Sequence, residues 1–219
     1  MTARAKKPAK SVSREDVLKA ALKHAPFDGF TESVLERAGK EAGASEDDLA
    51  RLFPEGALDL VEAFSDWADD EMEAALAKKK LAAMKIRDRI KTAVWARIDA
   101  LRNDKEAARR AGAFLTLPPH AAAGAKLLYR TVDRMWRAVG DTSTDFNFYT
   151  KRAILAGVYS STLMRWFTDQ SGDEAETKAF LDARIENVMQ FEKFKAQVKA
   201  RTKDWPSLSD MLGRFGSRP

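Results

Sequence analysis

Apolar residues recur every three or four positions through most of the chain, and this spacing constrains its fold more than any other feature. The pattern is most regular between Pro119 and Gly140. There, successive gaps of 4, 3, 4, 3 and 4 separate Ala121, Ala125, Leu128, Val132, Met135 and Val139. Such gaps place side chains along one face of a helix suited to a bundle. Because no segment alternates convincingly as a strand would, the sequence predicts an all-α protein.

Capping residues and helix breakers divide this pattern into separate helices. Capping boxes begin the first and third helices at Ser13 and Ser45, and Thr31 can cap the second. The residues that end the first and third helices are Pro26 with Gly29, and Pro54. Longer helices are expected at about 56–79, 82–102, 105–115, 118–139, 145–169 and 174–202.

The first three helices have the plan of a helix-turn-helix domain, with a tight turn at Gly43. The residues "Ala-Gly…Ser…Leu…Leu-Phe-Pro", followed by a long helix, are similar to TetR-type N-terminal domains. The predicted fold is therefore TetR-like: an N-terminal helix-turn-helix domain of three helices plus a C-terminal helical bundle. Its expected parts are a basic disordered arm at 1–11, the helix-turn-helix-like domain at 12–55, a ligand-binding and dimerisation bundle at 56–203, and an amphipathic tail at 204–219.

Charge is unevenly distributed along the chain. The net charge of +5 equals the number of basic residues that precede the first acid, Glu15, and the rest of the chain has equal numbers of acids and bases. Residues 41–77 contain twelve acids and one base, whereas residues 78–97 contain eight bases and one acid. We expect these two blocks to lie on different faces.

The start of the third helix argues against DNA binding. A recognition helix uses its first residues to contact base edges and phosphates, which carboxylates repel. Here those residues are Glu46, Asp47 and Asp48. DNA is therefore an unlikely partner, although a ligand-responsive TetR-type transcriptional repressor stays the alternative function.

Catalytic chemistry has few candidate residues. His24 and His120 are the only histidines, neither lies in a Glu-x-x-His pair, and the chain has no cysteine. A glycine-rich phosphate loop is also absent. We therefore predict no catalytic residues, no metal site and no enzyme activity. The lack of cysteine favours a reducing compartment.

The chain shows no segment that could cross a bilayer. No uncharged stretch, residues 153–164 included, reaches the ~20 apolar residues that a membrane helix needs. No apolar core follows the basic N-terminal residues, so a secretory signal is not expected. The expected location is cytoplasmic, in peripheral association with the inner membrane.

The segment from Gly140 to Thr162 carries the most specific signal. It reads GDTSTDFNFYTKRAILAGVYSST, an aromatic, charged helix start ahead of a small-residue interior. This segment closely resembles the signature of the ninth coenzyme Q biosynthesis protein family, the TetR-fold lipid-binding accessory factors of ubiquinone synthesis. The resemblance covers roughly residues 12–200. It implies that the chain acts in ubiquinone biosynthesis, binds an isoprenoid lipid or quinone in place of a cofactor, and presents it to a membrane-associated hydroxylase.

The middle of the 145–169 helix is the expected lipid site. Small side chains there are ringed by aromatic ones, which suits an apolar tunnel. The alternative is that another helix packs closely against them. With the weight of the resemblance, the residues expected to contact lipid are Trp136, Phe146, Ala156, Tyr159, Ser160, Leu163 and Phe167.

The resemblance also implies a docking surface for the demethoxyubiquinone hydroxylase or an equivalent quinone hydroxylase. The expected contact residues are Met135, Trp136, Asp145, Phe148 and Tyr149. Animal family members have Trp where this chain has Phe148, which puts the strength of docking in doubt. The alternative is that Phe146 and Tyr149 face the core and only Phe148 is exposed. A homodimer through the 145–169 and 174–202 helices is also expected.

The C-terminal tail can form a short amphipathic helix. Pro206 breaks the preceding helix, Ser207 can cap the next, and the following apolar residues share one face. Packing on its own bundle would satisfy this pattern as well as a bilayer would. Since the resemblance favours a membrane, the expected membrane contacts are Trp205, Leu208, Met211, Leu212 and Phe215. An interaction scaffold without a ligand is a third possible function.

Overall fold

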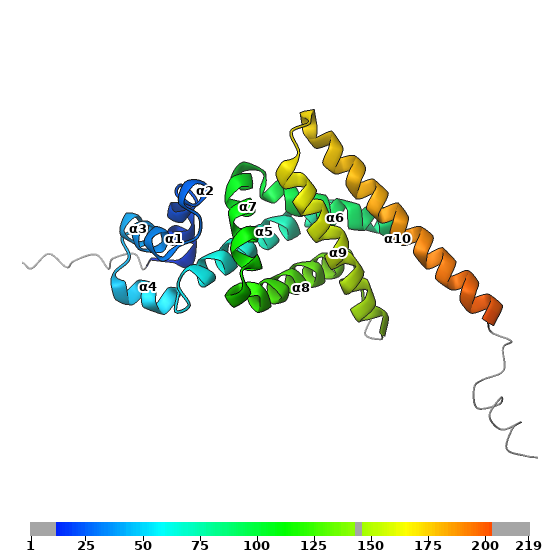
Figure 1. The fold of residues 1–219 in the computed structure, drawn as a ribbon, viewed down its shortest axis with the longest axis horizontal. Helices are drawn as coiled ribbons and strands as arrows, with labels where there is room; N and C mark the ends of the chain where they lie inside the picture. Colours follow the sequence, from blue (N-terminus) through cyan, green and yellow to red (C-terminus); the bar gives the residue numbers. More distant parts are fainter. Residues whose placement is uncertain (1–11, 143–145, 203–219) are drawn as a thin grey trace, which may run out of the picture.

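The computed structural model describes residues 12–142 and 146–202, and these residues fold into helices without a strand. The all-α prediction is confirmed. The α-helices are α1 (Arg14–Ala21), α2 (Ala25–Asp28), α3 (Glu32–Ala42), α4 (Glu46–Leu52), α5 (Ala57–Ala77), α6 (Ile86–Ala100), α7 (Lys105–Thr116), α8 (Ala121–Ala138), α9 (Phe146–Thr168) and α10 (Ala175–Thr202). Figure 1 shows α1–α4 gathered at one end of the molecule and α6–α10 at the other, with α5 between them.

The predicted caps form as expected in the α1–α4 head. The Ser13 and Ser45 side chains each accept a hydrogen bond from a backbone N–H three residues on, and Asp16 and Asp48 return the bond in both capping boxes. The hydroxyl of Thr31 accepts from the N–H of Val34 at 3.3 Å and begins α3. These caps fix the three helix starts that the sequence indicated.

One helix of the head differs from the prediction. The first helix ends at Ala21, before Pro26, and a separate four-residue helix, α2, holds Pro26 near its start. Proline is well accommodated in a first helical turn, where its missing N–H has no helical partner. Pro26 therefore begins a second short helix instead of ending the first, and the head has four helices where three were expected.

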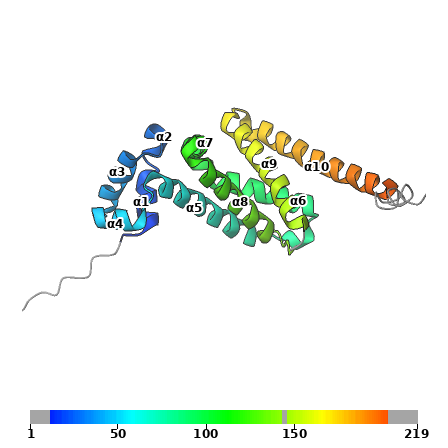
Figure 2. The ribbon, with the colours of Figure 1, turned by 60° about the horizontal axis from the view of Figure 1, so that its bottom comes forward.

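The long helix α5 joins the head to the bundle (Figure 2). It begins at Gly56, whose φ of 60° is left-handed and whose missing Cβ would lie 2.2 Å from a Glu32 carboxylate oxygen. That carboxylate accepts the N–H of Ala57 at 2.8 Å. Glycine is thus required at this position, because any side chain would displace the group that caps α5.

Helices α5, α6 and α8 pack together, and α9 lies between α8 and α10. In both Figures 1 and 2 the C-terminal half of α10 extends beyond the other helices. On α8 the predicted stripe is only partly buried: Val132, Met135 and Val139 are in the core, but Ala121 and Ala125 are exposed. Leu127 and Thr131, which are not part of that stripe, are also buried.

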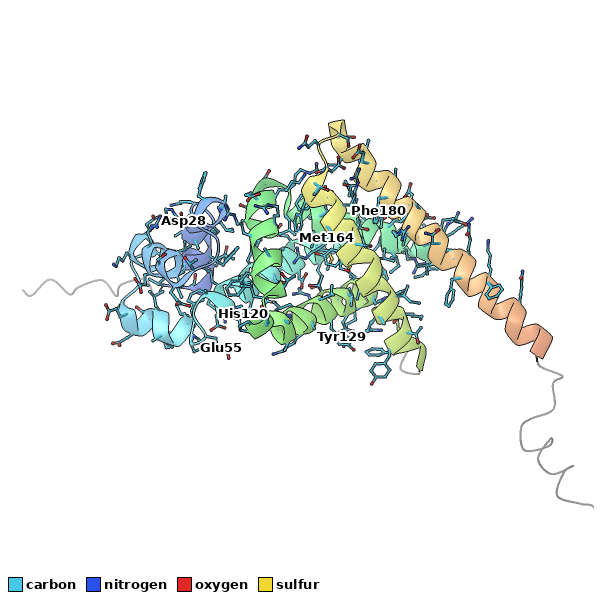
Figure 3. The ribbon with its side chains drawn as sticks, in the orientation of Figure 1. Asp28, Glu55, His120, Tyr129, Met164 and Phe180 are labelled. Carbon is cyan, nitrogen blue, oxygen red and sulfur yellow. The ribbon has the colours of Figure 1, made fainter. Side chains whose placement is uncertain are left out.

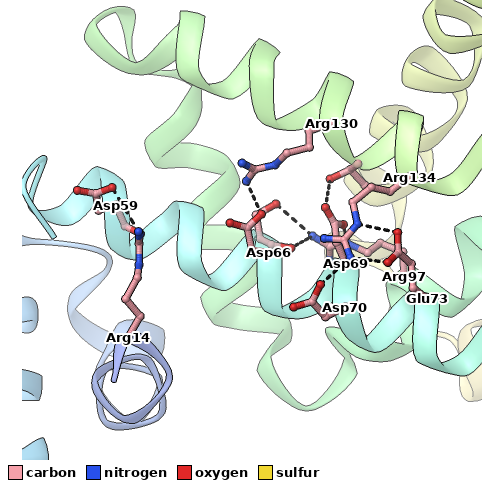
Figure 4. Close-up of polar contacts among 11 residues, drawn as sticks. Arg14, Asp59, Asp66, Asp69, Asp70, Glu73, Arg97, Arg130 and Arg134 are labelled. Atoms are coloured by element: carbon pink, nitrogen blue, oxygen red, sulfur yellow. Dashed lines mark hydrogen bonds and ion pairs between the residues drawn. The ribbon is translucent and has the colours of Figure 1, made fainter. Parts of the chain in front are cut away.

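Acids of α5 pair with bases of α8. Arg130 contacts Asp66 at 2.5 Å, and Arg134 contacts both Asp70 and Glu73 (Figure 4). The basic block at 78–97 therefore does not neutralise these acids of the acidic block. Its last member, Arg97, meets the acidic block inside the core, as described below.

Candidate functional site

Helix α9 has one buried face and one face exposed to solvent. Leu155, Val158, Tyr159 and Trp166 are buried, whereas Ala153, Gly157 and Met164 are exposed. Figure 3 labels Met164 on this helix, and 65% of it is exposed. A Cβ added at Gly157 would meet no atom within 4 Å. Ala153 and Gly157 therefore face solvent in the described chain and line neither of the cavities described below.

The inner side of α9 borders a cavity of about 230 Å³, here called cavity 1. It lies among α6, α8, α9 and α10. Apolar side chains line most of it, with Arg87, Thr150 and Lys151 as the polar or charged ones. The apolar lining residues are Ile86, Ile90, Trp136, Ile154, Leu155, Val158, Ile185, Val188 and Met189. Such a lining favours a hydrocarbon ligand.

A second cavity of about 130 Å³, cavity 2, is lined by α5, α6, α7, α8 and α9. Its walls are mostly leucine, valine, alanine and phenylalanine, but Arg97, Ser65, Thr131 and Tyr159 also line it. Gly124 of α8 allows this helix to approach α7, because a Cβ there would lie 2.9 Å from the carbonyl oxygen of Leu115. Cavity 2 is thus an apolar space with a polar end.

The polar end of cavity 2 is built around an ion pair between Arg97 and Asp69 (Figure 4). The Nε of Arg97 donates to Asp69 at 2.6 Å, and the Thr131 hydroxyl donates to the other Asp69 oxygen at 3.0 Å. The Nη2 of Arg97 donates to the Ser65 carbonyl at 3.2 Å. Arg97 and Asp69 are 4% and 0% exposed. Burial raises the pKa of the nearby Tyr159 phenol, so its hydroxyl stays protonated.

The residues predicted to bind lipid are divided between the two cavities. Trp136 lines cavity 1, and Tyr159 and Leu163 line cavity 2. Phe167 lies beside cavity 2, where a Cβ at Gly112 would be 3.5 Å from its ring. Ala156 and Ser160 are partly buried and line neither cavity. The side chain of Phe146 lies outside the described residues.

Of the polar residues that line cavity 2, only Tyr159 was predicted from the sequence, and Arg97, Ser65 and Thr131 were not. Arg97 comes from α6 and Asp69 from α5, 28 positions apart in the chain. A local signal could have indicated Arg97 and Asp69, because each is a charged residue within an apolar helical pattern. Ala96 and Ile98 flank Arg97, and Ala68 precedes Asp69. A charge inside such a pattern needs a buried partner.

The predicted docking element begins α9 and leaves Tyr149 on the surface, with 65% of the residue exposed. Phe148 is partly buried, and the Arg152 guanidinium lies 3.4 Å from its ring centre. The Trp136 indole donates to the Lys151 carbonyl at 3.1 Å. The alternative in which Tyr149 faces the core is therefore wrong.

Buried ion pairs hold this element to α8. Arg152 is 2% exposed and contacts Asp133 at 2.6 Å and Asp141 at 3.3 Å. Met135 has no exposed surface, so it supports the element from within and does not contact a partner in this conformation. Asp145 lies outside the described residues.

The first residues of α4 are exposed acids. Glu46 and Asp47 project at the helix start, and Asp48 is used in the cap with Ser45. This is the position from which a helix-turn-helix domain would contact DNA.

The two histidines have structural neighbours. His120 stacks on Phe114 with ring centres 4.1 Å apart, and His24 contacts Glu41 at 2.6 Å. Across residues 12–142 and 146–202, no cluster of three or more His, Asp or Glu side chains is arranged to hold a metal ion. None of the helices in those ranges combines the length and hydropathy of a bilayer-spanning segment. The predicted membrane contacts Trp205, Leu208, Met211, Leu212 and Phe215 lie outside the described residues.

Comparison with known proteins gives relatives along most of the chain. A family model described as COQ9 matches residues 121–192, which contain α8, α9 and much of α10. The chain is 33% identical over 191 residues to the mitochondrial ubiquinone biosynthesis protein COQ9 of Rattus norvegicus, covering 84% of this chain and 61% of that protein. The Homo sapiens protein of the same description is 31% identical, with 84% and 60% covered. The chain thus spans about 60% of the length of these relatives.

A solved structure supports the predicted fold. The TetR transcriptional regulator from Nitrosomonas europaea aligns with a TM-score of 0.61, covering 79% of this chain and 95% of that one. The sequences are 19% identical, so the likeness concerns the fold alone. The TetR-like architecture is confirmed.

Proposed function

Because the chain belongs to the COQ9 family of ubiquinone biosynthesis proteins, we propose that it is an accessory protein of that pathway which binds an isoprenoid quinone intermediate and presents it to a membrane-associated hydroxylase. The proposal gives the chain a binding role with no catalytic step of its own. The acids exposed at the start of α4 argue against the alternative, a DNA-binding repressor.

Cavity 1 is the observation that carries the lipid-binding proposal. Its lining is almost wholly apolar and comes from four helices. At about 230 Å³ it lies below the roughly 300–1,000 Å³ of typical small-molecule pockets, so it suits a portion of an isoprenoid chain. Ile86 at its edge is 48% exposed, which leaves an apolar surface where the remaining chain can continue.

The start of α9 supports the hydroxylase proposal. Tyr149 presents an aromatic ring to solvent on a helix that Arg152 fixes to α8. An exposed aromatic side chain on a rigid support is typical of an interface hot spot. The predicted contacts Asp145 and Phe148 precede it closely in the sequence.

Membrane contact and dimerisation complete the proposal. The relatives are mitochondrial proteins by name. We propose that this chain contacts a membrane surface through residues 205–215.

Exposed apolar residues on the outer surfaces of α9 and α10 suit a homodimer. These residues are Met164, Phe191 and Phe194.

Organic extraction of the purified protein, followed by mass spectrometry, tests the lipid proposal. The expected result is an isoprenoid quinone or a precursor of one, at close to one molecule per chain. Protein that contains no such lipid, and takes none up after delipidation, would leave only the scaffold function.

A further inference from the structure

Arg97 has a hydrogen-bond donor that no described group uses. Its Nε and Nη2 atoms donate to Asp69 and Ser65, but its Nη1 is buried without a hydrogen-bond partner in the described part of the chain. Buried donors are nearly always paired, since leaving one unpaired costs the free energy of its desolvation. Arg97 is a wall residue of cavity 2. An acceptor in that cavity would therefore complete the guanidinium.

We propose that cavity 2 binds the oxygen-bearing ring of a neutral quinone or phenol, with Arg97 donating a hydrogen bond to a ring oxygen. This inference rests on the proposed function for its ligand class. It adds the residue that would recognise the ring, and it places that ring farther along α9 than cavity 1, beside Tyr159 and Leu163.

The charges around Arg97 favour a neutral oxygen over an anion. Asp69 already balances the guanidinium at 2.6 Å, and both are almost fully buried. A carboxylate or phosphate bound here would be a second, uncompensated negative charge in a medium that screens poorly. A carbonyl, methoxy or phenol oxygen accepts the same hydrogen bond without that cost.

The rest of cavity 2 suits a flat ring. Phe64, Leu127 and Leu163 supply apolar walls. The protonated Tyr159 hydroxyl can donate to or accept from a second ring substituent. At about 130 Å³ the cavity is small for a whole lipid, so a ring group would bind here with its hydrocarbon tail outside.

The experiment measures how much the ring oxygens contribute to the binding affinity. Titration calorimetry compares three probes: a dimethoxy-benzoquinone with one prenyl group, prenylbenzene, and a prenylated benzoate. The wild-type protein is expected to bind the quinone at least roughly tenfold more tightly than prenylbenzene, as one hydrogen bond to a charged donor implies. The benzoate should bind more weakly than the quinone.

Arg97→Lys replaces the forked guanidinium with a single ammonium nitrogen that is expected to stay beside Asp69, so no donor should occupy the position of Nη1 and the preference for the quinone should be abolished. Arg134→Lys is the matched control, since Arg134 pairs with Asp70 and Glu73 and does not line the cavity, and it should leave the preference unchanged. If Arg97→Lys does not fold, Arg97→Met combined with Asp69→Leu removes both charges together, an exchange that buried pairs often tolerate.

Three results would overturn the inference. Equal binding of quinone and prenylbenzene by the wild type would overturn this inference and leave lipid binding intact, with water as the partner of Nη1. A preference that survives loss of Arg97 would overturn it too. Binding of neither uncharged probe would remove both the inference and the lipid-binding function.

Discussion

Arg152 lies with its guanidinium carbon 3.4 Å from the centre of the Phe148 ring, one turn earlier on α9. The same guanidinium contacts Asp133 of α8 and Asp141 of the turn that follows α8. One side chain therefore fixes the aromatic element, α8 and the intervening turn relative to one another.

Arg152→Ala should destabilise the protein by about 3–5 kcal/mol, because it removes the buried cation that contacts both Asp133 and Asp141. Urea denaturation measures the loss. The control is Arg137→Ala, which removes a mostly exposed partner of the same Asp133 and should cost about 0.2–1 kcal/mol. Equal losses of unfolding free energy in the two variants would show that the ion pairs of Arg152 behave like exposed ones.

Tyr149→Ala should weaken binding of the quinone hydroxylase by roughly tenfold or more, the effect expected of an aromatic hot spot. The melting temperature should change little, because Tyr149 is mostly exposed. Tyr129→Ala, at an exposed tyrosine of α8, should alter neither quantity. Pull-down titration with purified hydroxylase measures the affinity, and unchanged binding by Tyr149→Ala would contradict the docking proposal.

Val188→Trp should reduce the lipid recovered by extraction at least severalfold, since Val188 lines cavity 1 and a larger side chain would fill it. Asn187→Trp adds the same side chain at the neighbouring exposed position and should leave the lipid content unchanged. Mass spectrometry of matched amounts of protein gives the comparison. If both variants retain lipid equally, the hydrocarbon is bound elsewhere.

Asp169 should make the protein sensitive to acid. Its carboxylate accepts hydrogen bonds from Ser171 and Thr177 at the turn between α9 and α10, and these bonds hold the pKa of Asp169 far below its usual range. A pKa lowered by folding stabilises the protein above the unfolded value of about 3.8 and stops doing so as pH falls toward the folded value. The melting temperature of the wild type should therefore fall more steeply below that pH than that of Asp169→Asn. If the melting temperatures of the two proteins fall in parallel with pH, Asp169 does not make the protein sensitive to acid.

The protein should show no sequence-specific affinity for duplex DNA at physiological salt. Glu46 and Asp47 project where a recognition helix would meet phosphates, and their charge opposes the electrostatic attraction on which such binding depends. A promoter screen by fluorescence anisotropy tests this. An operator bound at nanomolar concentration would restore the repressor as the function.

The elements of the fold could be predicted because local rules determine them. Ser13, Thr31 and Ser45 begin helices at the expected positions, and Gly140 ends α8 with a φ of 91°. Pro26 was misjudged because proline stops one helix and begins another equally well, and the choice depends on what lies ahead of it.

The candidate site was harder to predict because it depends on rotation about helix axes. On α9, both faces contain small and aromatic residues, so periodicity could not show that Ala153 faces outward and Tyr159 inward. The Arg97–Asp69 pair depends on the approach of two helices, which no local pattern specifies. The family resemblance indicated Trp136, Tyr159 and Leu163, which line the cavities, but not Arg97 or the cavity residues of α10.

Helix α5 makes the head and the bundle parts of one folding unit. Its first turns place Leu60 and Phe64 in a core shared with Phe30 of the head, and its later turns bury Asp69 and Met72 in the bundle. Removing residues 12–55 would uncover half of this helix and its cap at Glu32. The head is therefore needed to cover and cap α5, whether or not it contacts DNA.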